Sequence, residues 1–147
     1  MAEDLPMMNT EQRQHAAAIA EAIRAKPEAY DQGKWGDEDL SMTKQLLPSC
    51  MTPACIAGWS LYLKRQWEEL YSRQTEPTAR QNLGLDATEA NALFSRCWAF
   101  EKGLLRSPTA AEAAAVMERL ARGDMKVLAE ICYSPPRRRK LEERYGR

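Results

Sequence analysis

The chain has 147 residues, with 21 Lys and Arg against 21 Asp and Glu, and 44% of its residues are hydrophobic. This balance excludes capture of DNA by the net charge of the whole chain, and the single histidine excludes most histidine-based catalytic and metal sites. The length suits one domain of ordinary size, and the composition is too apolar for a chain that is disordered throughout.

The first predicted helix follows a flexible N-terminus of residues 1–9 and runs from Thr10 to about Lys26. Apolar residues at helical spacing give it one inward face. These residues are Ala16, Ile19, Ala20 and Ile23. Pro27 ends the helix, because proline disfavours helical geometry in the residue before it. We expect His15 to face solvent.

A long ordered loop is expected after this helix, from Pro27 to Ser49. A loop of that length is unusual in a compact domain unless its own side chains anchor it, and Tyr30 and Trp35 are the candidates. Trp35 therefore either pins the loop or binds a partner. Residues 1–49 carry five basic and nine acidic side chains, which makes this part of the chain acidic.

The second predicted helix has a clear start, because Thr52 can cap it and Pro53 suits the first helical position. We expect it to continue to about Tyr71. Its apolar stripe consists of Cys55, Trp59, Tyr62, Leu63, Trp67 and Leu70. Residues 45–63 carry no charge, but prolines and glycine interrupt them, so we expect no transmembrane span.

Two shorter helices are expected next. The first runs from Pro77 to Leu83 and is broken by Gly84, and the second opens at Asp86, with Glu89 completing a capping box. The inward residues of the second are Ala90, Leu93 and Phe94. An aromatic connection with Cys97, Trp98 and Phe100 follows, in which Trp98 either pins the connection or anchors a partner.

The last long helix begins at Ser107-Pro108 or at Thr109 with Glu112, and Gly123 stops it. Its inward face consists of Ala113, Val116, Met117, Leu120 and Ala121. No segment alternates with a period of two for long enough to predict a sheet. We therefore predict an all-α fold, a single compact domain of five to six helices over residues 10–134.

Residues 135–147 form a basic C-terminal tail with six basic and two acidic side chains. Its charged run is Arg137, Arg138, Arg139 and Lys140. One interpretation is contact with nucleic-acid phosphates or with an acidic partner. The favoured alternative is a short solvated helix, in which arginines pair with Glu142 and Glu143 at helical spacing.

The cysteines suggest a weaker hypothesis, a thiol-dependent or zinc-dependent sensor. Cys55 lies near the start of a predicted helix, where the dipole favours a thiolate, and Cys50 could resolve its oxidised form. Four cysteines also give the ligand count of a structural zinc site, but their spacing is poor. We favour inert buried thiols, with no metal or cofactor, and with no export signal at the start we expect a cytoplasmic protein.

Motifs of catalysis do not stand out in this sequence. Neither a glycine-rich phosphate loop nor a local arrangement of nucleophile, base and carboxylate is visible. The pattern favours a non-enzymatic protein-interaction module, with an unidentified protein partner or a second copy of the chain bound through an apolar helix face.

Several motifs together resemble those of a loose group of small uncharacterised proteins from bacteria and tailed phages. The most specific is the segment from Cys50 to Trp59, Cys-Met-Thr-Pro-Ala-Cys-Ile-Ala-Gly-Trp. The others are Pro27–Gln32 with Trp35, Leu83-Gly84-Leu85 leading to Leu93-Phe94, and the alanine-rich helix after Pro108-Thr109. The resemblance covers roughly residues 19–127 and implies no activity. It implies a setting, an accessory protein of a phage, plasmid or mobile element that inhibits or adapts a host protein.

Overall fold

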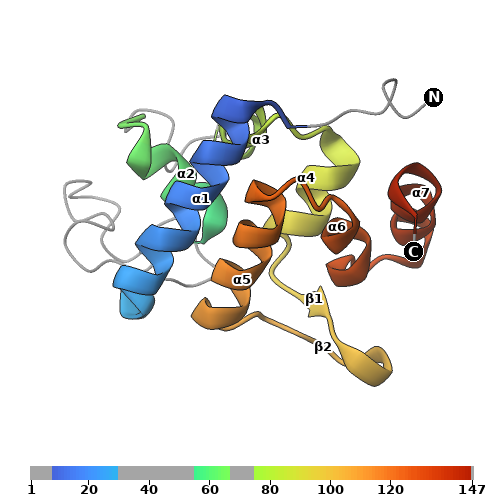
Figure 1. Ribbon diagram of the computed structural model, residues 1–147. Helices are drawn as coiled ribbons and strands as arrows, with labels where there is room; N and C mark the ends of the chain where they lie inside the picture. The colour runs from blue at the N-terminus through green and yellow to red at the C-terminus, as the bar shows by residue number, and fades with distance from the viewer. Residues whose placement is uncertain (1–7, 30–54, 67–74, 147) are drawn as a thin grey trace.

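The computed structural model describes residues 8–29, 55–66 and 75–146, which are mostly helical (Figure 1). Seven α-helices are found there: α1 (Thr10–Ala25), α2 (Ile56–Leu63), α3 (Thr75–Leu83), α4 (Ala87–Phe94), α5 (Ala110–Ala121), α6 (Lys126–Ile131) and α7 (Pro135–Tyr145). The remaining elements are the 3-10 turns η2 (Pro27–Ala29) and η5 (Glu101–Gly103) and the strands β1 (Trp98–Ala99) and β2 (Leu105–Arg106). The prediction of an all-α fold is confirmed.

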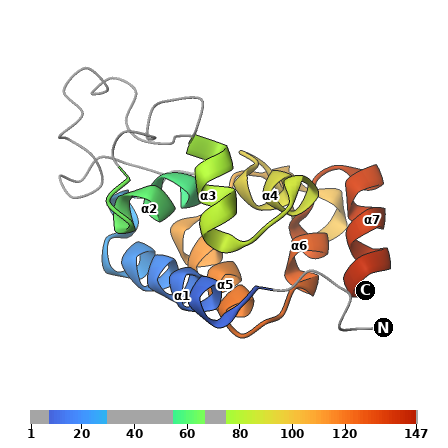
Figure 2. The ribbon, with the colours of Figure 1, turned by 90° about the horizontal axis from the view of Figure 1, so that it is seen from above.

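Helices α1 and α5 form the most extensive contact of the core and lie side by side in two views (Figures 1 and 2). The predicted inward face of α1 is confirmed, since Ala16, Ile19 and Ile23 are completely buried. Alanines on both helices keep the side chains short at the contact, which lets the two backbones approach closely. In the part of the chain that the structure describes, no helix is both long and apolar enough to span a bilayer.

Three helices begin with a reciprocal capping box. Asn9 and Gln12 form it at α1, Asp86 and Glu89 at α4, and Thr109 and Glu112 at α5. In each, the cap side chain accepts a hydrogen bond from a backbone N–H three residues on, and the later side chain accepts one from the cap backbone. The two boxes predicted at Asp86 and Thr109 are confirmed.

Glycine positions fix two of the helix ends. Gly84 follows α3 with a φ of +69°, and a Cβ atom there would lie 2.3 Å from the side chain of Gln12. Any other residue would therefore strain the backbone and also displace a member of the α1 capping box. Gly123 has a φ of +87° after α5, as the predicted stop requires.

Helix α2 differs from its prediction at both ends. Its N-cap is Cys55 rather than Thr52, and it ends at Leu63 rather than near Tyr71. The termination has a visible cause, because Arg65 adopts a left-handed backbone with a φ of +57°. The helix is also buried on all sides in its first six residues rather than along one stripe. Thr52, Trp67 and Tyr71 lie outside the described residues, as does the predicted loop beyond Ala29.

His15 does not face solvent, contrary to the prediction. Its side chain is only 8% exposed, and its Nε2 lies 2.7 Å from the Oγ of Ser60, which is itself completely buried. The Nδ2 of Asn82 donates to the same Oγ at 3.1 Å, so three helices meet in this polar cluster. The sequence around His15 is polar and does not indicate that this side chain contacts Ser60 on α2.

Candidate functional site

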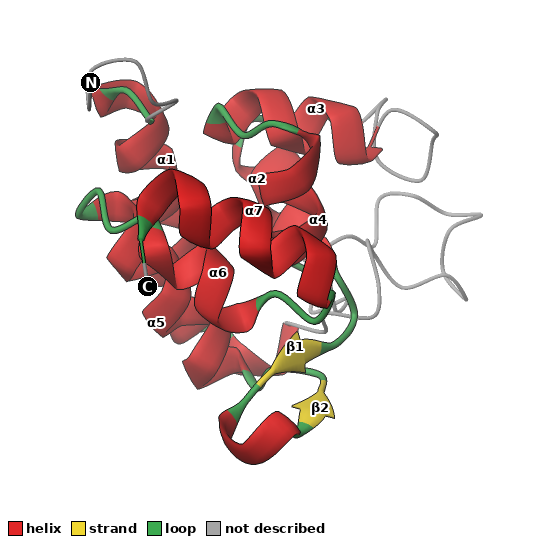
Figure 3. Ribbon diagram, turned by 90° about the vertical axis from the view of Figure 1, so that its right-hand side faces the viewer, coloured by secondary structure: helices red, strands yellow, loops and turns green. Residues whose placement is uncertain are grey.

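The hairpin of β1 and β2 projects from one end of the helical layers (Figures 1 and 3). Trp98 pairs with Arg106 and Ala99 with Leu105 in antiparallel register, and two-residue strands are too short to show a period in the sequence. Trp98 fixes the hairpin to the core, since it is completely buried and its Nε1 donates to the carbonyl oxygen of Leu93 at 3.2 Å. At the tip, Leu104 is 53% and Leu105 is 52% exposed.

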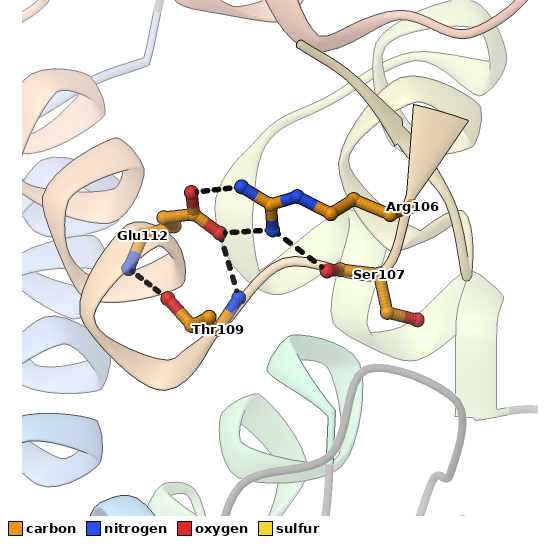
Figure 4. A network of polar contacts seen from close by, with 4 residues as sticks. All are labelled: Arg106, Ser107, Thr109 and Glu112. Carbon is orange, nitrogen blue, oxygen red and sulfur yellow. Dashed lines mark hydrogen bonds and ion pairs between the residues drawn. The ribbon is translucent and has the colours of Figure 1, made fainter. Parts of the chain in front are cut away.

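Arg106 joins the hairpin to α5 through the network in Figure 4. Its two terminal nitrogens donate to the two carboxylate oxygens of Glu112 at 2.7 and 2.6 Å, a bidentate pair. The guanidinium carbon also lies 3.8 Å from the centre of the Phe100 ring. Glu112 at the same time accepts from the backbone N–H of Thr109, so one carboxylate holds both the helix start and the hairpin.

Two arginines form ion pairs that lower the pKa values of glutamates on this surface. The hydrogen bonds from Arg106 lower the pKa of Glu112 to about 2, against the opposing effect of burial. Arg119 makes a second bidentate pair with Glu130, at 2.7 and 2.8 Å, and also donates to Asp124. These contacts lower the pKa of Glu130 and raise the pKa of Arg119. Both ion pairs are fully charged at neutral pH.

Between these ion pairs lies an apolar groove of about 390 Å³, bounded by the hairpin, α5 and α6. Its apolar walls are Trp98, Phe100, Ala115, Val116, Val127 and Ile131. Its charged lining consists of Glu101, Glu112, Glu130 and Arg119, three carboxylates against one guanidinium. A concave apolar surface with a charged border has the composition of a site for a partner's side chains.

The hairpin should depend on Glu112 for its rigidity. In Glu112→Gln, the amide can still cap α5 but gives up the charge-assisted pair with Arg106, so we expect amide exchange at Phe100 to become about tenfold faster. That amide donates to the carbonyl oxygen of Leu104 at 2.7 Å and so reports hairpin opening. Hydrogen exchange followed by NMR measures the rate. Glu118→Gln is the matched control, because Glu118 is also an α5 carboxylate paired with an arginine, Arg24 of α1, but lies away from the hairpin. Equal rates in both variants would contradict the proposed role.

A second cavity, of about 640 Å³, lies between α3, α4 and α7. Its basic lining residues are Arg80, Arg137 and Lys140, and its acidic one is Glu76. Only two of the four residues of the predicted basic run therefore line this cavity. Arg138 turns away and donates to the carbonyl oxygens of Glu130 and Cys132, where it caps α6, whereas Arg139 is exposed and does not line the cavity.

The predicted aromatic and cysteine site residues do not come together in one site within the described residues. Trp98 forms part of the groove wall, and Trp35 and Cys50 lie outside the described residues. Cys55 and Cys132 are buried and Cys97 is exposed. Within residues 8–29, 55–66 and 75–146, no group of three or more His, Cys, Asp or Glu side chains could hold a metal ion.

His15 and Ser60 lie at hydrogen-bond distance, as a base and a nucleophile do in hydrolases. Ser60 is completely buried, however, and its second partner, Asn82, donates to the serine rather than orienting the imidazole. The arrangement suits a structural role in joining α1, α2 and α3.

Comparison of the chain with protein-family models, curated proteins and solved structures finds no match.

Proposed function

We propose that this protein is a non-enzymatic protein-interaction module and that the groove beside the hairpin is its interface. The observation that carries the proposal is the combination of an apolar groove of about 390 Å³ with two half-exposed leucines on the hairpin that bounds it. Large exposed apolar side chains next to a concave apolar wall provide a docking surface.

The hairpin is also held in place before any partner arrives. Trp98 anchors the hairpin to the helical core, and the Arg106–Glu112 ion pair attaches it to α5. A preorganised surface loses little conformational freedom on binding, so more of the contact energy remains as affinity.

The charges of the groove define its occupant. Glu101, exposed at the hairpin turn, adds a negative charge beside the two ion pairs. A partner that places apolar side chains in the groove and a Lys or Arg at its edge would match both features. The proposed occupant is therefore a peptide segment with apolar residues flanked by a basic one.

A selection experiment tests this. Peptides selected from a displayed random library against the full chain should share apolar residues next to Lys or Arg. They should bind Ala115→Arg about tenfold more weakly, because Ala115 is exposed within the groove and a long cation there fills it and repels the basic residue. Ala111→Arg is the matched control, being exposed on the same helix outside the groove.

Two results would overturn the proposal. One is a set of selected peptides whose affinity is the same for Ala115→Arg and the unaltered chain. The other is a homodimer, seen by light scattering after gel filtration, that Ala115→Arg dissociates and Ala111→Arg does not, because the groove would then belong to a second copy.

The biological setting is proposed from the sequence. The resemblance in the Cys50–Trp59 segment favours an accessory protein of a phage or mobile element that inhibits or adapts a host protein. The four cysteines favour the cytoplasm, where thiols stay reduced.

A further inference from the structure

The cavity between α3, α4 and α7 lies on a different surface from the hairpin groove, and we propose that it binds the phosphate of a nucleotide. Three cations line it, Arg80 from α3 and Arg137 and Lys140 from α7, against the single carboxylate of Glu76. Residues 137 and 140 are three apart on α7 and therefore share one face. A phosphate group, with two negative charges and several acceptor oxygens, matches cations that converge from two helices.

The wall opposite the cations defines the rest of the ligand. Asn91 lines the cavity, and its Oδ1 is shielded from solvent with no hydrogen-bond partner in the described part of the chain. A buried acceptor without a donor is costly, and a phosphate at neutral pH offers few donors. The amino group of a base or a hydroxyl group of a ribose does offer one.

Size and lining agree with a nucleotide. The volume of about 640 Å³ falls in the range of small-molecule sites, and Phe94 adds an aromatic surface to the wall that holds Asn91. The phosphate could belong to a free nucleotide or to a nucleotide within a single strand, since both present the same groups to the cavity.

The test is an NMR titration of the full-length ¹⁵N-labelled chain with adenosine monophosphate, inorganic phosphate, adenosine and a short oligoadenylate. We expect adenosine monophosphate to shift the amides of residues 80, 91, 137 and 140, and to bind more tightly than phosphate or adenosine. If the oligoadenylate binds much more tightly than the mononucleotide at the same residues, the phosphate source is a strand. Binding confined to the mononucleotide identifies a free nucleotide.

Charge variants separate a built site from diffuse attraction. The double variant Arg137→Ala/Lys140→Ala should weaken binding of adenosine monophosphate at least tenfold, whereas Arg139→Ala, exposed on the same helix outside the cavity, should change it less than twofold. All three positions are exposed, so these substitutions should leave the fold intact.

Asn91→Ala should bring the affinity for adenosine monophosphate close to that for inorganic phosphate, because the nucleoside loses its acceptor. Equal weakening by Arg139→Ala and by the double variant would overturn the proposal, as would adenosine binding as tightly as its monophosphate. Saturation at none of the four residues with any of the phosphates at millimolar concentration would also overturn it.

Discussion

Leu141→Ala is expected to lower the free energy of unfolding by about 2–5 kcal/mol, the usual effect of emptying a leucine site in a core. Leu141 is completely buried, although it lies in a strongly charged segment, Arg-Arg-Arg-Lys-Leu-Glu-Glu-Arg. It is the buried residue of α7, a helix that packs on α6 and α4 (Figure 3). The loss of its side chain would leave α7 without its main apolar contact.

Urea denaturation followed by circular dichroism measures the change. Arg139→Ala is the matched control, two residues away on the same helix but exposed, and should shift the unfolding free energy by about 0.5 kcal/mol or less. Similar small effects in both variants would show that α7 is held by its polar contacts alone.

Those polar contacts surround Glu89, a carboxylate that is completely buried on α4. It accepts hydrogen bonds from the backbone N–H of Asp86 at 2.9 Å and from the hydroxyl of Tyr145. Arg144 lies 3.4 Å from the same carboxylate and 2.5 Å from Asp86. Burial, and then the bond to Glu89, raise the pKa of Tyr145, which therefore stays protonated and able to donate. The end of α7 thus neutralises a charge that would be costly alone.

Local signals in the sequence predicted most of the helix boundaries. A capping box spans only four residues, so Asp86 with Glu89 and Thr109 with Glu112 could be identified directly, as could the glycines that end α3 and α5. The second role of each carboxylate could not be predicted. Glu89 meets Tyr145, 56 residues away, and Glu112 meets an arginine from a hairpin that the sequence did not indicate.

The candidate sites, too, could be predicted only in part from residues that are close in the sequence. Composition alone singled out Arg137 and Lys140, but only the packing of α7 against the α3–α4 pair brings Arg80 and Asn91 to the same cavity. Likewise Trp98 was singled out as an aromatic in a connection, whereas the groove that it borders needs α5 and α6. A run of charges or an aromatic residue can be recognised from neighbours in the sequence. A cavity cannot, because it forms only when distant segments pack together.

Acid should destabilise this protein through His15. Burial, with a smaller contribution from the charge of Lys64, lowers the pKa of His15 in the folded protein from 6.5 to about 4. Between these two values the unfolded chain binds a proton that the folded chain does not, so the free energy of unfolding falls as the pH is lowered. A difference of this size corresponds to a loss of about 3 kcal/mol on going from pH 7 to pH 4.

Two measurements check this expectation. Because the chain has one histidine, its imidazole proton signal needs no assignment, and its titration in the folded protein should give a midpoint near pH 4. Urea denaturation at a series of pH values should show that the free energy of unfolding decreases as the pH falls from 6.5 to 4. In His15→Gln, which can still hydrogen-bond to Ser60, the free energy of unfolding should be nearly constant from pH 6.5 to about 5. Glu112 has a pKa of about 2 in the folded protein against 4.5 in the unfolded chain, so its own contribution is lost only below about pH 4.5, which separates the two groups. A midpoint near 6.5 would mean that water reaches the ring, and the cluster with Ser60 and Asn82 would then not be closed in solution.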